Sequence, residues 1–211
     1  MTVVIKLGGS LVSKGRELVQ LLREYADRTA RQLVIVPGGG PFADAIRTIA
    51  NHEGVSDDAA HWMAVLAMHQ YGLFLADDYP VVPLIEQLED VPAAGPLCII
   101  LPFNILKADD ALPHTWAVTS DTIAAFIASK LGERSFIKLT DVDGMLDENG
   151  TMIERIQALE LIETGYRGCI DAALPRYLAQ HHMSCVIVNG TVPERIIAVI
   201  EGRATICTRI E

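Results

Sequence analysis

Short apolar runs alternate along this chain with segments whose apolar residues recur every three or four positions. The short runs are rich in β-branched residues, which predicts buried strands. They occupy residues 3–5, 33–36, 97–101, 135–139, 184–188 and 204–208.

The segments with helical spacing lie between these runs. We expect helices to begin near Gly15, after Gly40, after Ser56, after Ser120, at Asp171 and at Pro193. Ser56 and Ser120 are predicted as N-caps, because serine accepts hydrogen bonds from free backbone N–H groups. The helix after Ser56 should end before Tyr79, and residues 81–113 should be irregular apart from their one strand. This alternation predicts a single domain over residues 1–211, with a mostly parallel sheet covered by helices on both faces.

Two glycine-rich turns follow the first two predicted strands. Gly8-Gly9-Ser10 follows the first strand, and Gly38-Gly39-Gly40 follows the second. Glycine turns beside helix N-termini bind anions through free N–H groups, and Lys6 lies close enough in sequence to reach a phosphate held there. The alternative is a strand lysine beside an ordinary turn. Parallel strands would place both turns at the carboxyl-end edge of the sheet, where open α/β sheets bind ligands.

The composition narrows the possible functions. The chain has 211 residues, half of them hydrophobic, and a formal net charge of −10, which argues against nucleic-acid and anionic-membrane partners. No apolar run approaches the roughly eighteen residues of a membrane-spanning helix. The beginning of the chain has no signal-peptide pattern, and the four cysteines are too scattered for a zinc site, so we expect a reducing cytoplasm. Walker-type, dinucleotide and protein-kinase fingerprints are missing from the sequence.

Several acidic and histidine residues have both a functional and a structural interpretation. Asp121 falls in the first turn of a helix, where it would stabilise the helix dipole by about 0.3–1 kcal/mol without any catalytic role. Asp141 and Asp143 are explained equally by turn chemistry. His61 and His69 lie on one predicted helix and are interpreted as packed or half-exposed side chains.

Four segments together resemble the amino-acid kinase superfamily: Lys6–Ser10, Pro37–Gly40, Thr119–Ala124 and Leu139–Gly144. The resemblance implies a three-layer αβα sandwich and ATP-dependent phosphoryl transfer. It implies that Lys6 contacts the transferring phosphoryl group and that Asp121 lies near the acceptor. The nucleotide would be bound by Gly8, Gly9, Ser10, Lys14, Thr140, Asp141, Val142, Asp143, Gly144 and Met145. The acceptor would be bound by Gly38, Gly39, Gly40, Arg47 and Ser120.

The segment Gly168-Cys169-Ile170-Asp171 departs from the acetylglutamate kinases of this superfamily, which carry a second catalytic lysine here. An aspartate in this region is similar to uridylate kinases, where it positions the phosphate-binding lysine. Asp171 therefore joins the expected catalytic residues, and the acceptor should be a small phosphomonoester. Residues 60–64, 112–116 and 118–121 resemble a narrower branch of small archaeal-type kinases, which turn a phosphomonoester into a diphosphate in methanofuran biosynthesis.

A phosphate acceptor is already an oxyanion and needs no general base. Lys6, the turn N–H groups and Mg²⁺ would offset the repulsion between the two anions, with no protein metal ligands assigned. Asp121 and Asp171 would orient Lys6, and a cationic substrate end would suit Asp44, Asp57 or Asp58. The alternatives are another kinase of the superfamily, with a uridylate, isopentenyl phosphate or carboxylate acceptor, and a non-catalytic nucleotide-binding protein. We also expect a homo-oligomer, with the alanine-rich helix over residues 57–71 as a candidate interface.

Overall fold

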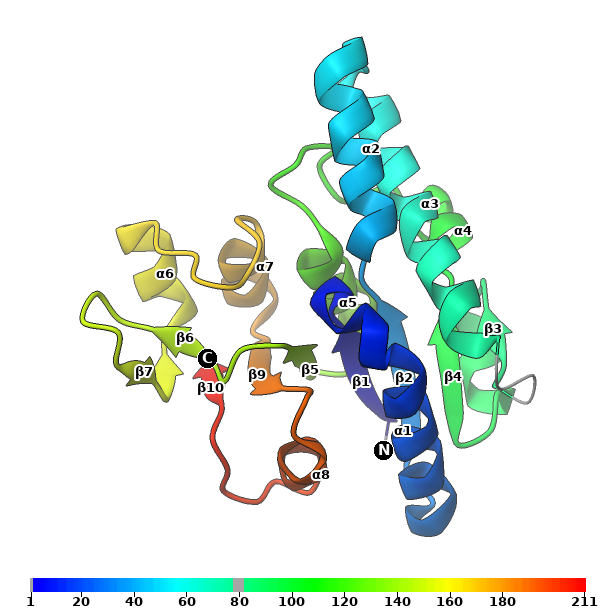
Figure 1. Cartoon of the computed structure of the whole chain (residues 1–211), viewed down its shortest axis with the longest axis vertical. Helices are drawn as coiled ribbons and strands as arrows, with labels where there is room; N and C mark the ends of the chain where they lie inside the picture. Colours follow the sequence, from blue (N-terminus) through cyan, green and yellow to red (C-terminus); the bar gives the residue numbers. More distant parts are fainter. Residues whose placement is uncertain (1, 78–81) are drawn as a thin grey trace.

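A computed structural model describes residues 2–77 and 82–211 of the chain. The predicted helix end at Tyr79-Pro80 therefore lies outside the described residues. Figure 1 shows a central sheet with helices packed against both of its faces.

The described strands form a sheet in the order β3-β4-β2-β1-β5-β9-β10-β8, with β1 near its middle (Figure 1). Neighbouring strands are parallel except for β10 and β9, so the predicted mostly parallel sheet of an αβα sandwich is confirmed. Their bounds are β1 (Thr2–Leu7), β2 (Gln32–Pro37), β3 (Leu84–Ile85), β4 (Leu97–Ile100), β5 (Ser135–Thr140), β8 (Arg155–Ile156), β9 (Ser184–Asn189) and β10 (Thr208–Ile210). A separate hairpin joins β6 (Met145–Leu146) to β7 (Met152–Ile153).

Helices cover both faces of the sheet. The 3₁₀ helices are η1 (Gly9–Lys14) and η2 (Leu88–Ala93). The α-helices are α1 (Gly15–Thr29), α2 (Gly40–Glu53), α3 (Asp57–Ala76), α4 (Pro102–Ala108), α5 (Ser120–Lys130), α6 (Ala158–Thr164), α7 (Leu174–His181) and α8 (Pro193–Ile200).

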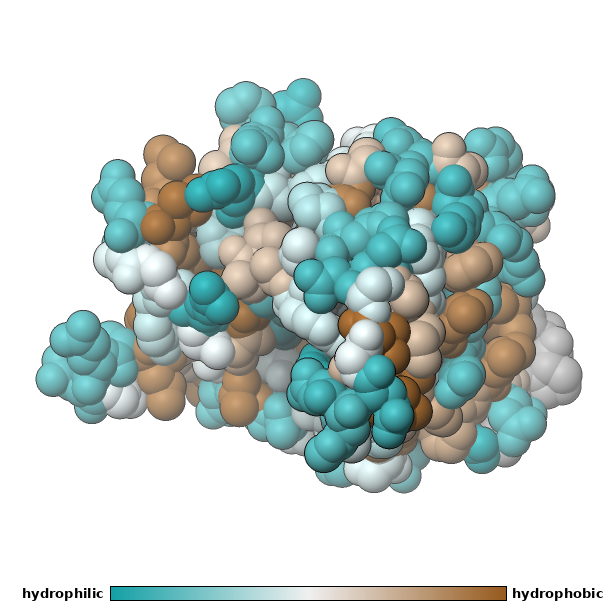
Figure 2. Space-filling model, turned by 90° about the horizontal axis from the view of Figure 1, so that it is seen from above, coloured by the Kyte–Doolittle hydropathy of each residue, from teal (hydrophilic) through white to brown (hydrophobic). Residues whose placement is uncertain are grey.

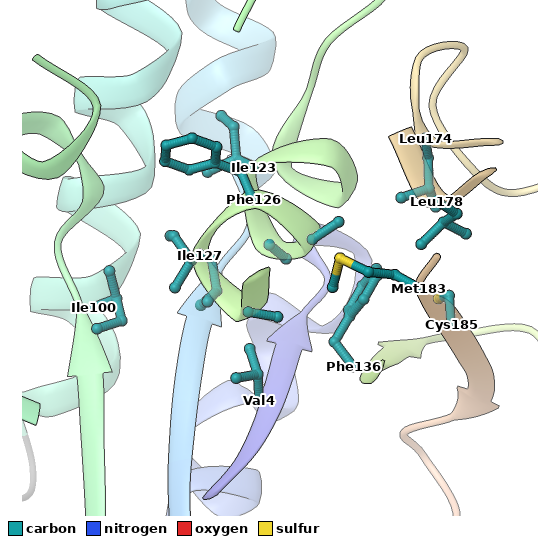
Figure 3. Packing of buried hydrophobic residues seen from close by; sticks show 14 of the residues in the cluster. Val4, Ile100, Ile123, Phe126, Ile127, Phe136, Leu174, Leu178, Met183 and Cys185 are labelled. Carbon is teal, nitrogen blue, oxygen red and sulfur yellow. The ribbon is translucent and has the colours of Figure 1, made fainter. Parts of the chain in front are cut away.

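Successive residues of the central strands enter opposite hydrophobic cores, as the period of two requires. Val4 of β1 packs with α5 and α7 in one core, and Figure 3 shows Ile123, Phe126 and Ile127 above the strands and Leu174 beside them. Ile5, the next residue, belongs to the second core, which is completed by α1 and α8. The strands that carry the glycine turns are therefore buried on both sides and rigidly placed.

Several predicted boundaries are wrong. Ser120 is the first residue of α5 rather than its N-cap, which is Thr119. Asp171 precedes α7, which begins at Leu174 with a proline in its first turn. The last strand is Thr208–Ile210 rather than 204–208.

Short elements account for the remaining differences. Residues 81–113 contain β3, η2 and α4 besides the predicted strand, and β8 and α6 had no prediction. Elements this short carry too few residues to display a period. The N-cap at Ser56 and the start of α8 at Pro193 are confirmed.

The two glycine turns lie against each other. A Cβ atom built on Gly9 would lie 2.3 Å from the Cα atom of Gly40, and one built on Gly38 would lie 2.9 Å from the Gly9 nitrogen. These contacts are between backbones, so no side-chain movement relieves them. Glycine is required here because the two turns approach each other so closely.

Gly9→Ala should therefore destabilise the protein by about 1–3 kcal/mol or more, because its methyl group must push two backbones apart. Urea unfolding measures the change. Ser13→Ala, an exposed substitution in the same 3₁₀ helix, is the matched control and should cost under about 0.5 kcal/mol. Equal stability of the two variants would contradict the close contact of the turns.

Candidate active site

A cavity of about 380 Å³ opens where the two glycine turns meet. Gly9, Ser10, Gly39 and Gly40 line one side of it. The rest of its wall comes from α2, α3 and the segment that enters α5, with Asp44, Arg47, Asp57, His61, Trp116 and Ser120 among its residues. The cavity is therefore bounded by the glycine turns on one side and by acidic, basic and aromatic side chains elsewhere.

Asp121 lies directly after the cavity residue Ser120 and contacts two buried lysines. Its Oδ1 atom lies 2.9 Å from Lys6 Nζ, and its Oδ2 atom lies 2.5 Å from Lys138 Nζ. Lys6 is 6% exposed, and Asp121 and Lys138 are each 3% exposed. Lys138 also donates to the carbonyl of Cys169. The predicted residues Lys6 and Asp121 are thus brought together, and Asp121 is no exposed helix-dipole aspartate.

Lys138 was not predicted as a site residue. It is the register partner of Lys6 on the adjacent parallel strand β5, so the two side chains leave the same face of the sheet. The sequence held one signal for it, since Ile137-Lys138-Leu139 repeats Ile5-Lys6-Leu7. Lys138 therefore adds a second lysine beside Asp121 that the sequence interpretation did not include.

Asp171 fixes the N-terminal end of α5. Its carboxylate accepts hydrogen bonds from the backbone N–H and the hydroxyl of Thr119, from both donors of Thr122, and from the Leu174 N–H, at 2.6–3.0 Å. Its own N–H donates to Asp121 Oδ2 at 3.1 Å. Asp171 therefore positions Asp121, which contacts Lys6, and its charge also opposes the lowering of the Lys6 pKa.

The charges of the cluster shift one another's pKa values. Burial alone would raise the pKa of Asp121, but Lys6 and Lys138 lower it to about 2. Burial lowers the pKa of Lys6 against the attraction of Asp121. Burial would also lower the pKa of Lys138, yet Asp121 overrides it and raises that pKa. Burial and the charge of Asp121 raise the pKa of Asp171.

The segment predicted to hold the nucleotide base and ribose lies at the end of β5. Asp143 Oδ1 accepts hydrogen bonds from Asn189 at 2.8 Å and Arg195 at 2.6 Å, so one of its oxygens is already engaged. Met145 and Thr140 are buried, whereas Asp141 and Val142 are exposed. Lys14 is exposed at the end of η1 and forms no ion pair with a described residue, so the structure does not bring it to the cluster.

The donors present fit a nucleotide phosphate chain. The first N–H groups of η1 and α2 have no partner within their helices and converge at the contact of the two turns. Asp121 Oδ1 lies 2.9 Å from Lys6 Nζ, and an ammonium group has three donors, so the lysine retains donors for a phosphate. In residues 2–77 and 82–211, no group of three or more His, Cys, Asp or Glu side chains is arranged to hold a metal. Phosphate oxygens and water would therefore supply most ligands of a Mg²⁺ ion here.

The predicted acceptor residues are distributed around the cavity. Gly39, Gly40, Arg47 and Ser120 line it, whereas Gly38 lies beneath and donates its N–H to the Leu7 carbonyl at 2.8 Å. Arg47 is held by Asp44 at 2.8 Å and lies 5.0 Å from the ring centre of Trp116. His61 and Trp116 were not predicted in this wall, because the elements that carry them meet only in three dimensions.

Asp121→Asn should destabilise the protein by about 3–5 kcal/mol, because two buried ammonium groups lose their common counter-charge. Urea unfolding at neutral pH measures this. Asp143→Asn removes an exposed carboxylate paired with Arg195 and should cost under about 1 kcal/mol. An Asp121→Asn protein as stable as the wild type would show that Lys6 and Lys138 do not need the charge of Asp121 to remain buried.

The contribution of Asp121 should also depend on pH. Its pKa of about 2 lies below its ordinary value of 3.8, so folding favours the ionised form. The stabilisation is complete above about pH 4 and is lost as the pH falls toward 2. The difference in unfolding free energy between the wild type and Asp121→Asn should therefore shrink on acidification from pH 5 to about 2.5. A constant difference across this range would contradict the lowered pKa.

Comparison with known proteins agrees with this geometry. The sequence profile of the amino acid kinase family matches residues 1–189. The [5-(aminomethyl)furan-3-yl]methyl phosphate kinase of Methanocaldococcus jannaschii is 32% identical and is aligned over 98% of this chain and 96% of its own. The uridylate kinase of Archaeoglobus fulgidus is 24% identical in sequence over 97% of each chain.

Solved structures share the fold. The crystal structure of uridylate kinase from Archaeoglobus fulgidus superposes with a TM-score of 0.77 over all of both chains, at 22% identity. That of UMP kinase from Ureaplasma parvum gives a TM-score of 0.77 over 100% of this chain and 99% of the other, at 16% identity. With the family profile covering most of its length and its lysine–aspartate cluster lying under two glycine turns, the chain belongs to the amino acid kinase family.

Proposed function

We propose that this protein transfers the terminal phosphoryl group of ATP to the phosphate of a small phosphomonoester and releases a diphosphate. The acceptor we favour is [5-(aminomethyl)furan-3-yl]methyl phosphate, because a kinase named for it is 32% identical over nearly the whole chain. The observation that carries the proposal is the buried Lys6–Asp121–Lys138 cluster beneath two contacting glycine turns.

The residues act by positioning and by neutralising charge. Phosphoryl transfer needs alignment and electrostatic stabilisation more than covalent participation by the protein. Lys6 would face the transferring group, and the N–H groups of the two turns would hold phosphates on either side of it. Asp121 keeps Lys6 and Lys138 in place, and Asp171 keeps Asp121 in place. Bound Mg²⁺ would add positive charge between the phosphates.

Lys138 bears on the choice of acceptor. The lack of a second lysine in residues 168–171 disfavours carboxylate acceptors, but Lys138 lies beside Asp121 and offers one. A phosphate acceptor is therefore supported by the relatives and by the glycine turns that line the cavity. Acetylglutamate kinases also match the chain, so carboxylate acceptors belong in the experiment.

A homo-oligomer remains part of the proposal. Leu66 and Leu73 of α3 and Ile49 of α2 are large exposed hydrophobic side chains. Leu66 and Leu73 are seven residues apart, and so lie on one side of α3. Figure 2 shows apolar patches among predominantly hydrophilic side chains on the face seen from above.

No described helix is long and apolar enough to cross a membrane. The cytoplasm stays the expected location.

Lys6→Met should lower turnover by at least ~100-fold, because one preorganised charge at the transferring group is lost. A coupled ADP assay measures this, with a thermal melt to show that the variant is folded. Lys130→Met, which removes a half-exposed lysine paired with Asp109 on the far end of α5, is the control and should keep full turnover. Undiminished turnover in Lys6→Met would place the chemistry elsewhere.

The acceptor class should appear directly in the products. With ATP and Mg²⁺, we expect a diphosphate from the aminomethylfuran phosphate and no hydroxamate from glutamate, acetylglutamate, aspartate or carbamate in the presence of hydroxylamine. Phosphorus NMR identifies the diphosphate. A hydroxamate without turnover of any phosphomonoester, including UMP and isopentenyl phosphate, would assign the protein to carboxylate acceptors. ATP binding without any turnover would support the non-catalytic alternative.

A further inference from the structure

His61 is a buried polar side chain in the wall of the cavity. It lies on α3, is 7% exposed, and contributes to the lining on the side away from the strands. Neither of its ring nitrogens forms a hydrogen bond with a described residue. The ring nitrogens are not among the fully buried atoms that lack a partner, so the imidazole is open to the cavity that it lines. A ligand or water in that cavity would satisfy it.

Packing alone holds the ring in place. His61 stacks on His114, with ring centres 4.3 Å apart and planes 14° apart, and Trp62 contacts it edge-on at 5.0 Å. His114 is itself held between Asp58 at 2.5 Å and Asp110 at 2.7 Å. The orientation of His61 is thus fixed without use of its nitrogens. Both nitrogens remain available to a bound molecule.

The charges around His61 favour a neutral ring. Burial lowers its pKa, and the neighbouring His114 and Lys107 lower it further, against the opposite effects of Asp110 and Asp58. The hydrogen bonds of His114 to Asp58 and Asp110 raise the pKa of His114, so of the two stacked rings His114 binds a proton more readily than His61. A neutral imidazole offers one lone pair to a donor.

Two carboxylates line the same cavity as His61. Asp57 lies one helical turn before His61 on α3, and both line the cavity. Asp44 also lines it and is partly neutralised by Arg47. A neutral acceptor atom beside carboxylates suits an amine or ammonium donor and repels a phosphate. The glycine turns line the same cavity, and their N–H groups suit a phosphate and not a cation.

We infer that His61 determines acceptor specificity by accepting a hydrogen bond from an amine at the end of the substrate remote from its phosphate. This rests on the proposed function. The cavity would then orient an aminoalkyl or aminomethyl-heteroaromatic phosphomonoester, with its phosphate against Gly39 and Gly40 and its amine against His61. Asp57 would offset the positive charge of that amine. His61 is thus a specificity residue, remote from the transferring phosphoryl group.

Two substitutions separate recognition from packing. His61→Phe keeps an aromatic ring for the contacts with His114 and Trp62 and removes both nitrogens. His61→Gln keeps a hydrogen-bond acceptor and loses the ring. Asp90→Asn, an exposed carboxylate substitution on η2 outside the cavity, is the control. Thermal melts show which variants are folded.

The probes are [5-(aminomethyl)furan-3-yl]methyl phosphate and the analogue in which a methyl group replaces the aminomethyl group. We expect the wild type to favour the amine by at least ~10-fold in kcat/KM, mostly through KM. His61→Phe should reduce that ratio toward one, His61→Gln should retain part of it, and Asp90→Asn should keep it whole. A ratio unchanged in His61→Phe, or an equal loss for both substrates, would show a purely structural role and overturn the inference.

Binding separates this inference from the proposed function. Calorimetric titration of both phosphomonoesters into the full chain requires no turnover. Amine-selective binding that His61→Phe abolishes would support the inference even if no phosphomonoester is phosphorylated. Turnover of both probes without amine selectivity in the wild type would leave the proposed function standing and overturn the role of His61.

Discussion

The site depends on one carboxylate that neutralises two buried ammonium groups. Burying Lys6 and Lys138 without Asp121 would cost several kcal/mol for each unpaired charge. Asp121 must therefore stay within about 3 Å of both lysines, which fixes the N-terminal end of α5 over the ends of β1 and β5. Asp171 holds the N-terminal end of α5 in this position by accepting hydrogen bonds from Thr119 and Thr122. The cluster thus connects β1, β5, α5 and the segment before α7, which are far apart in the sequence.

The parallel sheet supplies the geometry that this pairing needs. Lys6 and Lys138 are in register on adjacent strands, so their side chains leave the sheet side by side. The residues flanking them, Ile5 with Leu7 and Ile137 with Leu139, enter the opposite core. The same alternation that builds the hydrophobic cores therefore places the two positive charges together. A shift of one residue in register would bury them in the wrong core.

The sequence predicted the parts of this arrangement that follow local rules. The apolar runs predicted the long strands, and the glycine turns predicted the end of the sheet where the cavity opens and where Lys6 meets Asp121. Lys138 was not predicted as a site residue because its strand has the pattern of a buried core strand, and its partner Asp121 lies 17 residues away on another element. The position of His61 in the cavity wall was not predicted either, because its surroundings depend on His114, which a loop places against α3. Contacts between distant elements produce no periodic pattern in the sequence.

The charge of the cluster would allow an acidic protein to bind the two phosphates of the proposed reaction. The chain carries a formal net charge of −10, which repels phosphates at long range. Lys6, Lys138 and Asp121 together carry a net charge of one positive unit. Because this charge is buried, salt screens its attraction for a bound phosphate less than it screens the repulsion from the acidic residues at the surface. The free N–H groups of η1 and α2 add partial positive charge at the same place. Under the proposed function, local charge at the turns, rather than the overall charge of the protein, would therefore determine which end of an acceptor faces the phosphoryl donor.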